Sequence, residues 1–136
     1  MRISSRSIAI TPDRPVFLSG YAASPRESQG VRSALEANAI LFDTADGLTG
    51  LISVDACFVG SDFIALVRKQ LNDPAVELVF VASHTHYGPS LDPSKPKLGQ
   101  TDTEWFARAA GLIASQVNQM IAGSTVETEA RYGHDA

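Results

Sequence analysis

The sequence predicts an α/β fold in which a mixed β-sheet packs with two main helices. Apolar runs typical of strands alternate along the chain with two segments that have helical spacing. The pair Asp46-Gly47 separates two of the apolar runs, as in a β-hairpin. A length of 136 residues suits one domain, and 44% hydrophobic residues supply its core. We therefore expect residues 1–136 to form a single α/β unit.

The expected strands are bounded by turn-forming residues. Pro12 and Pro15 enforce a turn between the first two short strands. A polar loop over residues 24–30 then leads to the two arms of the hairpin, and a further apolar run precedes a pair of histidines. The strands are expected at residues 7–10, 16–18, 35–43, 48–55 and 79–82.

The first helix is expected to begin at Ser61, a favourable N-cap residue. Ile64, Val67 and Leu71 recur on one face of this segment, as the core face of a helix requires. Pro74 follows shortly after and cannot continue the helix. We expect the helix to end before this proline.

The second helix, over residues 101–122, has stronger signals. Thr101 and Glu104 form a capping box at its start, and Gly123 ends it. Its apolar stripe indicates a core face rather than a cofactor site, so we expect Leu112→Ala to cost about 2–5 kcal/mol of stability. The stripe consists of Trp105, Phe106, Ala109, Leu112, Ile113, Val117, Met120 and Ile121.

Composition excludes several classes of protein. The formal net charge is -4 and no basic run is longer than Arg68-Lys69, so no nucleic-acid partner is expected. No run approaches the roughly 18 apolar residues of a transmembrane segment. No signal peptide is visible, because no apolar region follows Arg2 and Arg6. A cytoplasmic location is the default expectation.

The single cysteine, Cys57, excludes an internal disulfide. It lies in the apolar stretch 56–59, where we expect a buried, unreactive thiol. A nucleophilic role is the alternative, because Asp55 is close in sequence. The sequence does not show the electropositive, partly exposed setting that a reactive thiol needs. We therefore favour the buried thiol.

A His-x-His pair ends the apolar run at residues 79–82. The segment reads Ser83-His84-Thr85-His86-Tyr87-Gly88-Pro89. Because side chains alternate along a strand, His84 and His86 are expected to point into the same space. Neutral imidazole is a common zinc ligand, so the pair is a candidate metal site. The alternative from spacing alone is a structural pair.

Asp55 is a second candidate site residue. It ends the strand at residues 48–55, and sites collect at the carboxyl ends of strands in α/β sheets. Beside the histidine strand its carboxylate would orient an imidazole. The equally weighted alternative is a carboxylate that caps a loop amide. The loop at residues 87–100, with three prolines and two glycines, is either the rim of a site or a tolerated insertion.

The histidine segment resembles the signature of the neutral/alkaline (non-lysosomal) ceramidase family. That signature is Ser/Thr-His-Thr-His-Ser-Gly-Pro after a hydrophobic strand, and Tyr87 stands here where the family usually has Ser. The His-Thr-His-x-Gly-Pro part is specific. Shorter matches, which mostly indicate strands, follow in the family's order at residues 10–12, 20–21, 37–42 and 51–55.

The resemblance implies a zinc-dependent amidase that hydrolyses the N-acyl bond of ceramide. By motif position it makes His84 a zinc ligand and His86 a second ligand or a neighbour that polarises the substrate. The family's other ligands, a later His, a Glu and a Tyr, and its serine nucleophile lie downstream of the region matched. We therefore interpret the chain as the N-terminal part, or a truncated relative, of a larger hydrolase domain that is inactive alone.

The resemblance also implies a lipid amide substrate in an apolar cleft beside the zinc. Tyr87 and Leu91 are the residues that we expect to line it. Many members of the family are exported. The alternative is a small non-catalytic α/β domain that forms homo-oligomers and carries a structural or vestigial histidine pair. We treat His134, near the end of the sequence, as a surface residue.

Overall fold

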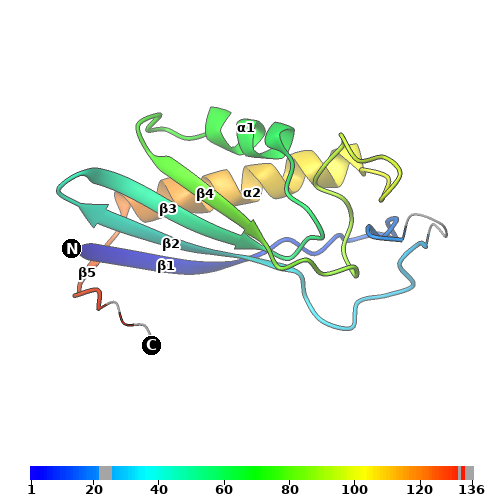
Figure 1. Cartoon of the computed structure of the whole chain (residues 1–136), viewed down its shortest axis with the longest axis horizontal. Helices are drawn as coiled ribbons and strands as arrows, with labels where there is room; N and C mark the ends of the chain where they lie inside the picture. The colour runs from blue at the N-terminus through cyan, green and yellow to red at the C-terminus, as the bar shows by residue number, and fades with distance from the viewer. Residues whose placement is uncertain (22–25, 132, 134–136) are drawn as a thin grey trace.

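The computed structural model describes residues 1–21, 26–131 and 133. Within this part of the chain, strands and helices follow one another with one helix between the third and fourth strands (Figure 1). In chain order the elements are β1 (Arg2–Ala9), β2 (Glu36–Thr44), β3 (Gly47–Val54), α1 (Ser61–Lys69), β4 (Glu77–Ala82), α2 (Thr103–Ala122) and β5 (Val126–Glu127).

The strands form one mixed sheet in the order β4-β3-β2-β1-β5. The pairs β1–β2, β2–β3 and β1–β5 are antiparallel, whereas β4 runs parallel to β3. A parallel pair needs a crossover connection, which α1 supplies. Both helices lie on the same face of the sheet (Figure 1). The predicted mixed sheet with two main helices is confirmed.

The hairpin predicted at Asp46-Gly47 joins β2 to β3. Thr44 and Gly47 are the last pair of the antiparallel ladder. The Thr44 hydroxyl accepts a hydrogen bond from the Asp46 amide at 3.2 Å. Gly47 has a φ of +127°, which glycine adopts more readily than other residues. This turn fixes the register of the two central strands.

The hydrophobic core lies between one face of the sheet and the two helices. Alternate residues of β2 and β3 point into it, because successive side chains of a strand point to opposite faces. Trp105 of α2 is buried there, and its indole nitrogen donates to the Ile10 carbonyl at 2.6 Å. The core residues include Ala37, Ala39, Leu41, Ile52, Val54, Phe63, Val67, Trp105, Ala109, Ile113 and Val117.

The predicted core face of α2 is correct for Trp105 and Ile113 but wrong for Leu112. The Leu112 side chain is 39% exposed. The buried stripe runs through Ala109 and Val117 at four-residue spacing, and Leu112 lies to one side of it. Leu112→Ala is therefore expected to lower the free energy of unfolding by less than the truncation of a core residue would.

The start of α2 also differs from the prediction. Asp102, rather than Thr101, is the N-cap, and its carboxylate accepts a hydrogen bond from the Trp105 amide at 2.9 Å. Arg14 pairs with the same Asp102 carboxylate at 3.0 Å and so stabilises this cap. Gly123 ends the helix as predicted. Neither helix of the described residues is long and apolar enough to cross a membrane.

Phe63 and Val67 are the buried core residues of α1, and Phe63 was not among the core residues predicted from the sequence. The helix begins at Ser61 as predicted, but Gly60 is its N-cap and no side chain caps it. Phe63 and Val67 are fully buried, whereas Ile64 is only partly buried. The core face is thus rotated by one residue from the predicted one.

The amino-terminal strand is longer than predicted, because β1 begins at Arg2 rather than at residue 7. Residues 16–18 do not form the expected strand. They contribute one isolated bridge, between Phe17 and Glu27. β5 is not predictable from the sequence, because two residues are too few to show an alternating pattern.

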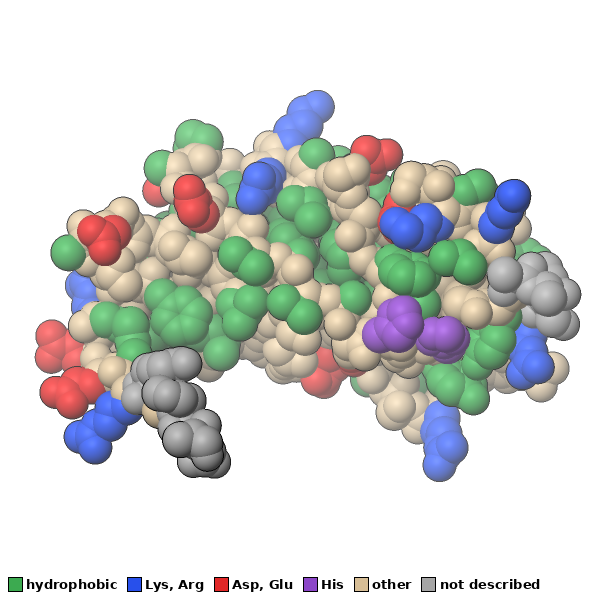
Figure 2. Space-filling model, viewed as in Figure 1, with side chains coloured by type: hydrophobic (Ala, Val, Ile, Leu, Met, Phe, Trp, Pro, Cys, Tyr) green, Lys and Arg blue, Asp and Glu red, His purple; other side chains and the backbone are tan. Residues whose placement is uncertain are grey.

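The face of the sheet away from the helices is partly apolar. Ile40, Leu51 and Val79 are partners across β2, β3 and β4, and each is more than one third exposed. Val81 extends this row along β4. Figure 2 shows hydrophobic side chains gathered over this face, with the described histidines at one end of it. We call Ile40, Leu51, Val79 and Val81 the open-face patch.

Candidate metal centre

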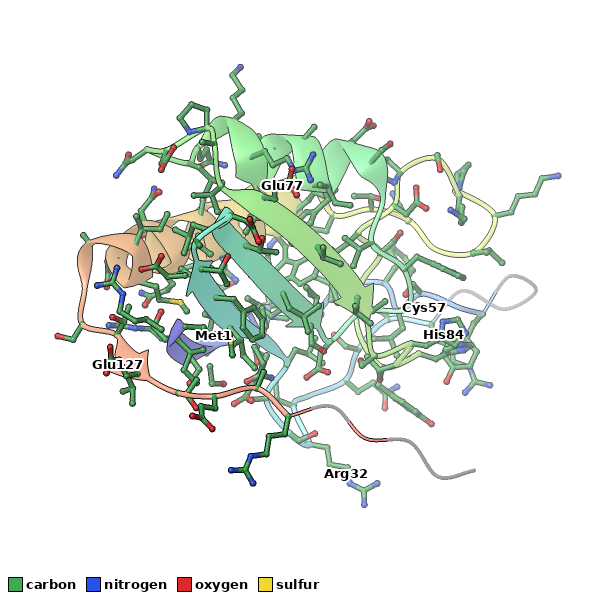
Figure 3. All side chains as sticks on the ribbon, turned by 60° about the vertical axis from the view of Figure 1, so that its left-hand side comes forward. Met1, Arg32, Cys57, Glu77, His84 and Glu127 are labelled. Carbon is green, nitrogen blue, oxygen red and sulfur yellow. The ribbon has the colours of Figure 1, made fainter. Side chains whose placement is uncertain are left out.

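The parallel pairing of β3 with β4 builds the site. Val54 and Ala82, the last residues of the two strands, are partners in the ladder. The segments that follow them therefore leave the sheet at the same edge, as the carboxyl ends of parallel strands do. Cys57 follows β3 and His84 follows β4, and Figure 3 shows the two residues beside each other beyond the strand ends.

His84 is not part of the strand, contrary to the prediction. β4 ends at Ala82, and His84 has a φ of +61°, in the left-handed region that non-glycine residues seldom adopt. Strand alternation therefore does not explain why the histidines converge. They do converge, because the rings of His84 and His86 have their centroids 5.1 Å apart in an edge-to-face arrangement.

The backbone carbonyl of Cys57 orients the His84 ring. The His84 Nδ1 atom lies 2.8 Å from the Cys57 carbonyl oxygen. Because a carbonyl only accepts hydrogen bonds, Nδ1 carries the proton and Nε2 keeps its lone pair. Phe58 packs edge-to-face on the same ring, with centroids 5.3 Å apart. His84 thus presents one nitrogen that is ready to bind a metal.

His86 rests on the backbone of Gly20. A Cβ atom at Gly20 would lie 2.4 Å from His86 Nδ1, so only glycine allows the ring to approach this closely. Gly20 has a φ of +91°. Tyr21 packs edge-to-face on the same ring, with centroids 5.6 Å apart. The Gly20 Cβ position is nearly equidistant from Nδ1, Cγ and Cε1 of His86, so Gly20 packs against the face of the ring and leaves its nitrogens uncovered on that account.

Cys57 is the residue that the sequence analysis missed as a candidate ligand. Its side chain is buried, as predicted, but its Sγ lies 3.7 Å from His84 Nδ1. Burial raises the pKa of the Cys57 thiol, and a hydrogen bond with Ser19 opposes this rise. One ligand atom from each of Cys57, His84 and His86 lies within 4.8 Å of the other two, so these three residues could hold a metal ion.

A signal for Cys57 was present in the sequence. It lies two residues after Asp55, at the strand end where site residues were expected. Cysteine thiolate and imidazole are both regular zinc ligands. What the sequence did not show was that β3 and β4 are parallel neighbours, which alone brings Cys57 to the histidines.

Within the described residues, the Asp55 carboxylate forms no hydrogen bond with either histidine ring. Its carboxylate accepts a hydrogen bond from the Glu36 amide at 3.0 Å, which is the amide-capping arrangement weighed as the alternative. The Cys57 carbonyl, rather than Asp55, accepts the proton of His84 Nδ1. A part for Asp55 in the chemistry of the site stays a prediction.

A groove runs beside the histidine loop, with a volume of about 1150 Å³. Tyr87 is 73% exposed and lines this groove together with Thr85. Leu91 does not reach it, contrary to the prediction. Its side chain is completely buried in the core, where its backbone forms a bridge with Val59. The other walls come from residues 11–16, Leu18, residues 26–35, Asp55 and Pro89.

Asp92 forms hydrogen bonds and an ion pair within the loop at residues 87–100. The Asp92 carboxylate accepts a hydrogen bond from the Ser94 amide at 3.1 Å and forms an ion pair with Lys95. Burial raises the pKa of Asp92, but the hydrogen bonds from Lys95 and Ser94 outweigh it and hold the pKa below its usual value. A charged Asp92 therefore links Ser94 and Lys95 within this loop.

The same loop forms backbone hydrogen bonds with Ser19 and Gly20, and Gly20 packs against His86. The Ser19 amide donates to the Gly88 carbonyl at 2.9 Å, and the Gly20 amide donates to the Leu98 carbonyl at 2.5 Å. The loop predicted as a rim thus borders the histidine pair through its contact with residues 19–20. His134 lies outside the described residues.

Two ceramidase structures share this fold. The crystal structure of neutral ceramidase from Pseudomonas aeruginosa matches 89% of this chain with a TM-score of 0.74 and 16% sequence identity. The chain has the fold of part of a neutral ceramidase. A second structure, of a ceramidase complexed with C2, matches the same share of the chain with a TM-score of 0.71 and 16% identity.

The similarity covers only a part of those enzymes. The chain spans about a fifth of each ceramidase chain, 21% in both cases. No protein-family model matches the sequence. No curated protein matches it either. The resemblance first indicated by the histidine motif is thus confirmed at the level of the fold.

Proposed function

We propose that this chain supplies the His84–His86 part of the zinc centre of an amide hydrolase similar to neutral ceramidase. The observation that carries the proposal is the orientation of His84. Its Nδ1 proton is held by the Cys57 carbonyl, so Nε2 is the nitrogen available to a metal, and the ring centroid lies 5.1 Å from that of His86. The shared fold of the ceramidase structures supports this assignment.

The donor set at this edge of the sheet fits zinc. Zinc binds imidazole nitrogen and cysteine sulfur, and its histidine ligands usually donate their second nitrogen to a carbonyl or carboxylate. His84 has this arrangement. A zinc ion bound here would polarise an amide carbonyl or lower the pKa of a bound water. A longer chain or a neighbouring subunit would supply the remaining ligands and the nucleophile.

The protein's own residues would position the ion and the substrate. Cys57 and Phe58 hold the His84 ring, and Gly20 fixes the depth of the His86 ring. The groove beside Thr85 and Tyr87 would hold the substrate, which we propose to be a lipid amide. Apolar groups suited to an acyl chain line this groove, among them Val16, Leu18, Val31 and Leu35.

Substitution of each histidine in a full-length protein tests the proposal. We expect His84→Ala to abolish bound zinc and amidase activity together, because it removes the oriented ligand. We expect His86→Ala to reduce activity at least as much as metal content. Zinc is measured by elemental analysis and turnover with a short-chain N-acylsphingosine. Ser83→Ala, an exposed neighbour, is the control and should change neither. Stoichiometric zinc and full turnover in both histidine variants would refute the proposal.

A second candidate function is self-association, which the open-face patch favours. A row of apolar side chains across three strands is a surface that a second copy of the chain would cover. We expect sedimentation velocity to show a dimer or larger species at high concentration. Val79→Lys places a charge on the 52% exposed Val79 and should shift the chain toward monomer. A monomer at all concentrations would argue against this function.

A further inference from the structure

We propose that Cys57 is a metal ligand together with His84 and His86, and that this chain alone holds one thiophilic divalent ion such as zinc. The inference rests on the proposed role of the histidine pair and adds the third ligand. A site with one thiolate and two imidazoles would have the three protein ligands of a catalytic zinc site, and its fourth position would take water or substrate, or a ligand from a longer chain or a neighbouring subunit.

The three ligand atoms are more widely spaced than those of a tetrahedral zinc centre, but they are near enough for side-chain rotation to bring them to one ion. Zinc lies about 2.3 Å from sulfur and about 2.0–2.1 Å from nitrogen, so neighbouring ligand atoms are roughly 3.3–3.7 Å apart. The three ligand atoms here lie within 4.8 Å of one another.

The backbone of Cys57 already organises the site. Its carbonyl accepts the His84 Nδ1 proton, while its Sγ lies beside the same ring at 3.7 Å. One residue would therefore orient a ligand and provide another. This double role depends on the parallel β3–β4 pair, which brings residues 57 and 84 to one edge of the sheet.

The contacts of Cys57 fit a ligand better than the two alternatives from the sequence. A nucleophile must reach the substrate, but the Cys57 side chain is only 1% exposed. An inert core thiol would have only apolar neighbours, whereas this sulfur lies within 4.8 Å of a ring nitrogen of each of the two histidines. A buried sulfur beside two imidazoles is the setting of a metal-bound thiolate.

The donor set also predicts which ions bind. Thiolate and imidazole ligands favour zinc, cobalt and cadmium, whereas magnesium, calcium and manganese prefer carboxylate and carbonyl oxygens. We therefore expect the isolated chain to bind zinc and cobalt and to leave magnesium unbound at the same concentration.

Cobalt titration of the 136-residue chain tests the inference by absorption spectroscopy. We expect one cobalt ion per chain and a thiolate-to-cobalt charge-transfer band in the near ultraviolet. Cys57→Ser should remove this band and weaken zinc binding by more than about tenfold, as loss of a ligand should cost at least as much as loss of a supporting contact. The band in the wild-type chain requires no variant, so a folding defect of Cys57→Ser would not leave the inference untested.

Two controls separate this inference from the proposed function. Thermal melts without metal should show that Cys57→Ser keeps its fold, and Ser83→Ala should keep the charge-transfer band. Cobalt bound without that band, and with equal affinity in Cys57→Ser, would overturn the role of Cys57 and leave the histidine pair in place. Cobalt bound equally well by His84→Ala would remove the proposed function as well.

Discussion

Phe63→Ala should lower the free energy of unfolding by about 3–5 kcal/mol. The Phe63 side chain is completely buried between α1 and the rest of the core. Its ring packs edge-to-face with Phe106, at a centroid distance of 5.2 Å, and with Phe80, at 6.4 Å. The substitution removes both contacts and leaves a cavity that close-packed neighbours fill only in part. Equilibrium unfolding in urea measures the effect.

Leu112→Ala is the matched control for this prediction. It also truncates a large apolar residue on a helix, but its side chain is 39% exposed. We expect a loss of less than about 1 kcal/mol, as for a surface substitution. Equal losses for Leu112 and Phe63 would mean that the assigned core faces of the two helices are wrong.

Local signals made much of the fold predictable from the sequence. The turn at Asp46-Gly47 and the stop at Gly123 depend on a few neighbouring residues, and both were predicted correctly. The two-stranded contact of β1 with β5 depends on pairing between residues about 125 positions apart, Arg2 with Glu127. No local pattern encodes such a pairing, so β5 was missed.

The site was predictable in its residues but not in its geometry. His84 and His86 do share one space, but through a left-handed loop residue rather than through strand alternation. Cys57 joins them only because β3 and β4 are parallel, which one sequence does not show. Leu91 was misplaced because a loop residue was assumed to face solvent, whereas its side chain is in the core.

The short motif Gly20-Tyr21 has a structural role that the sequence did not reveal. The pair Gly20-Tyr21 entered the sequence analysis only as a weak match to the ceramidase family. In the structure both residues pack on His86, Gly20 below the ring and Tyr21 at its side. The match thus corresponds to a steric requirement of the histidine site. This requirement can be tested without reference to the reaction.

Gly20→Ala should weaken metal binding by this chain by about 10–100-fold, the usual effect of losing a group that supports a metal ligand. A Cβ atom at this position would lie 2.4 Å from Nδ1 and 2.6 Å from Cγ of His86. The clash reaches the base of the ring, so the whole imidazole must move. The measurement is zinc affinity by competition with a chromophoric chelator, together with the melting temperature without metal.

Gly47→Ala separates the clash from backbone strain. Gly47 also has a positive φ, +127°, but a Cβ there would meet nothing within 4 Å. It lies in the hairpin turn, at the opposite end of β3 from the histidines. Both variants should melt at a lower temperature, because alanine is strained at positive φ. Only Gly20→Ala should also lose affinity for zinc, since only there does the new methyl group displace His86. Unchanged zinc affinity in Gly20→Ala would show that the ion does not depend on the position of His86, and the histidine pair would then have to be interpreted as structural.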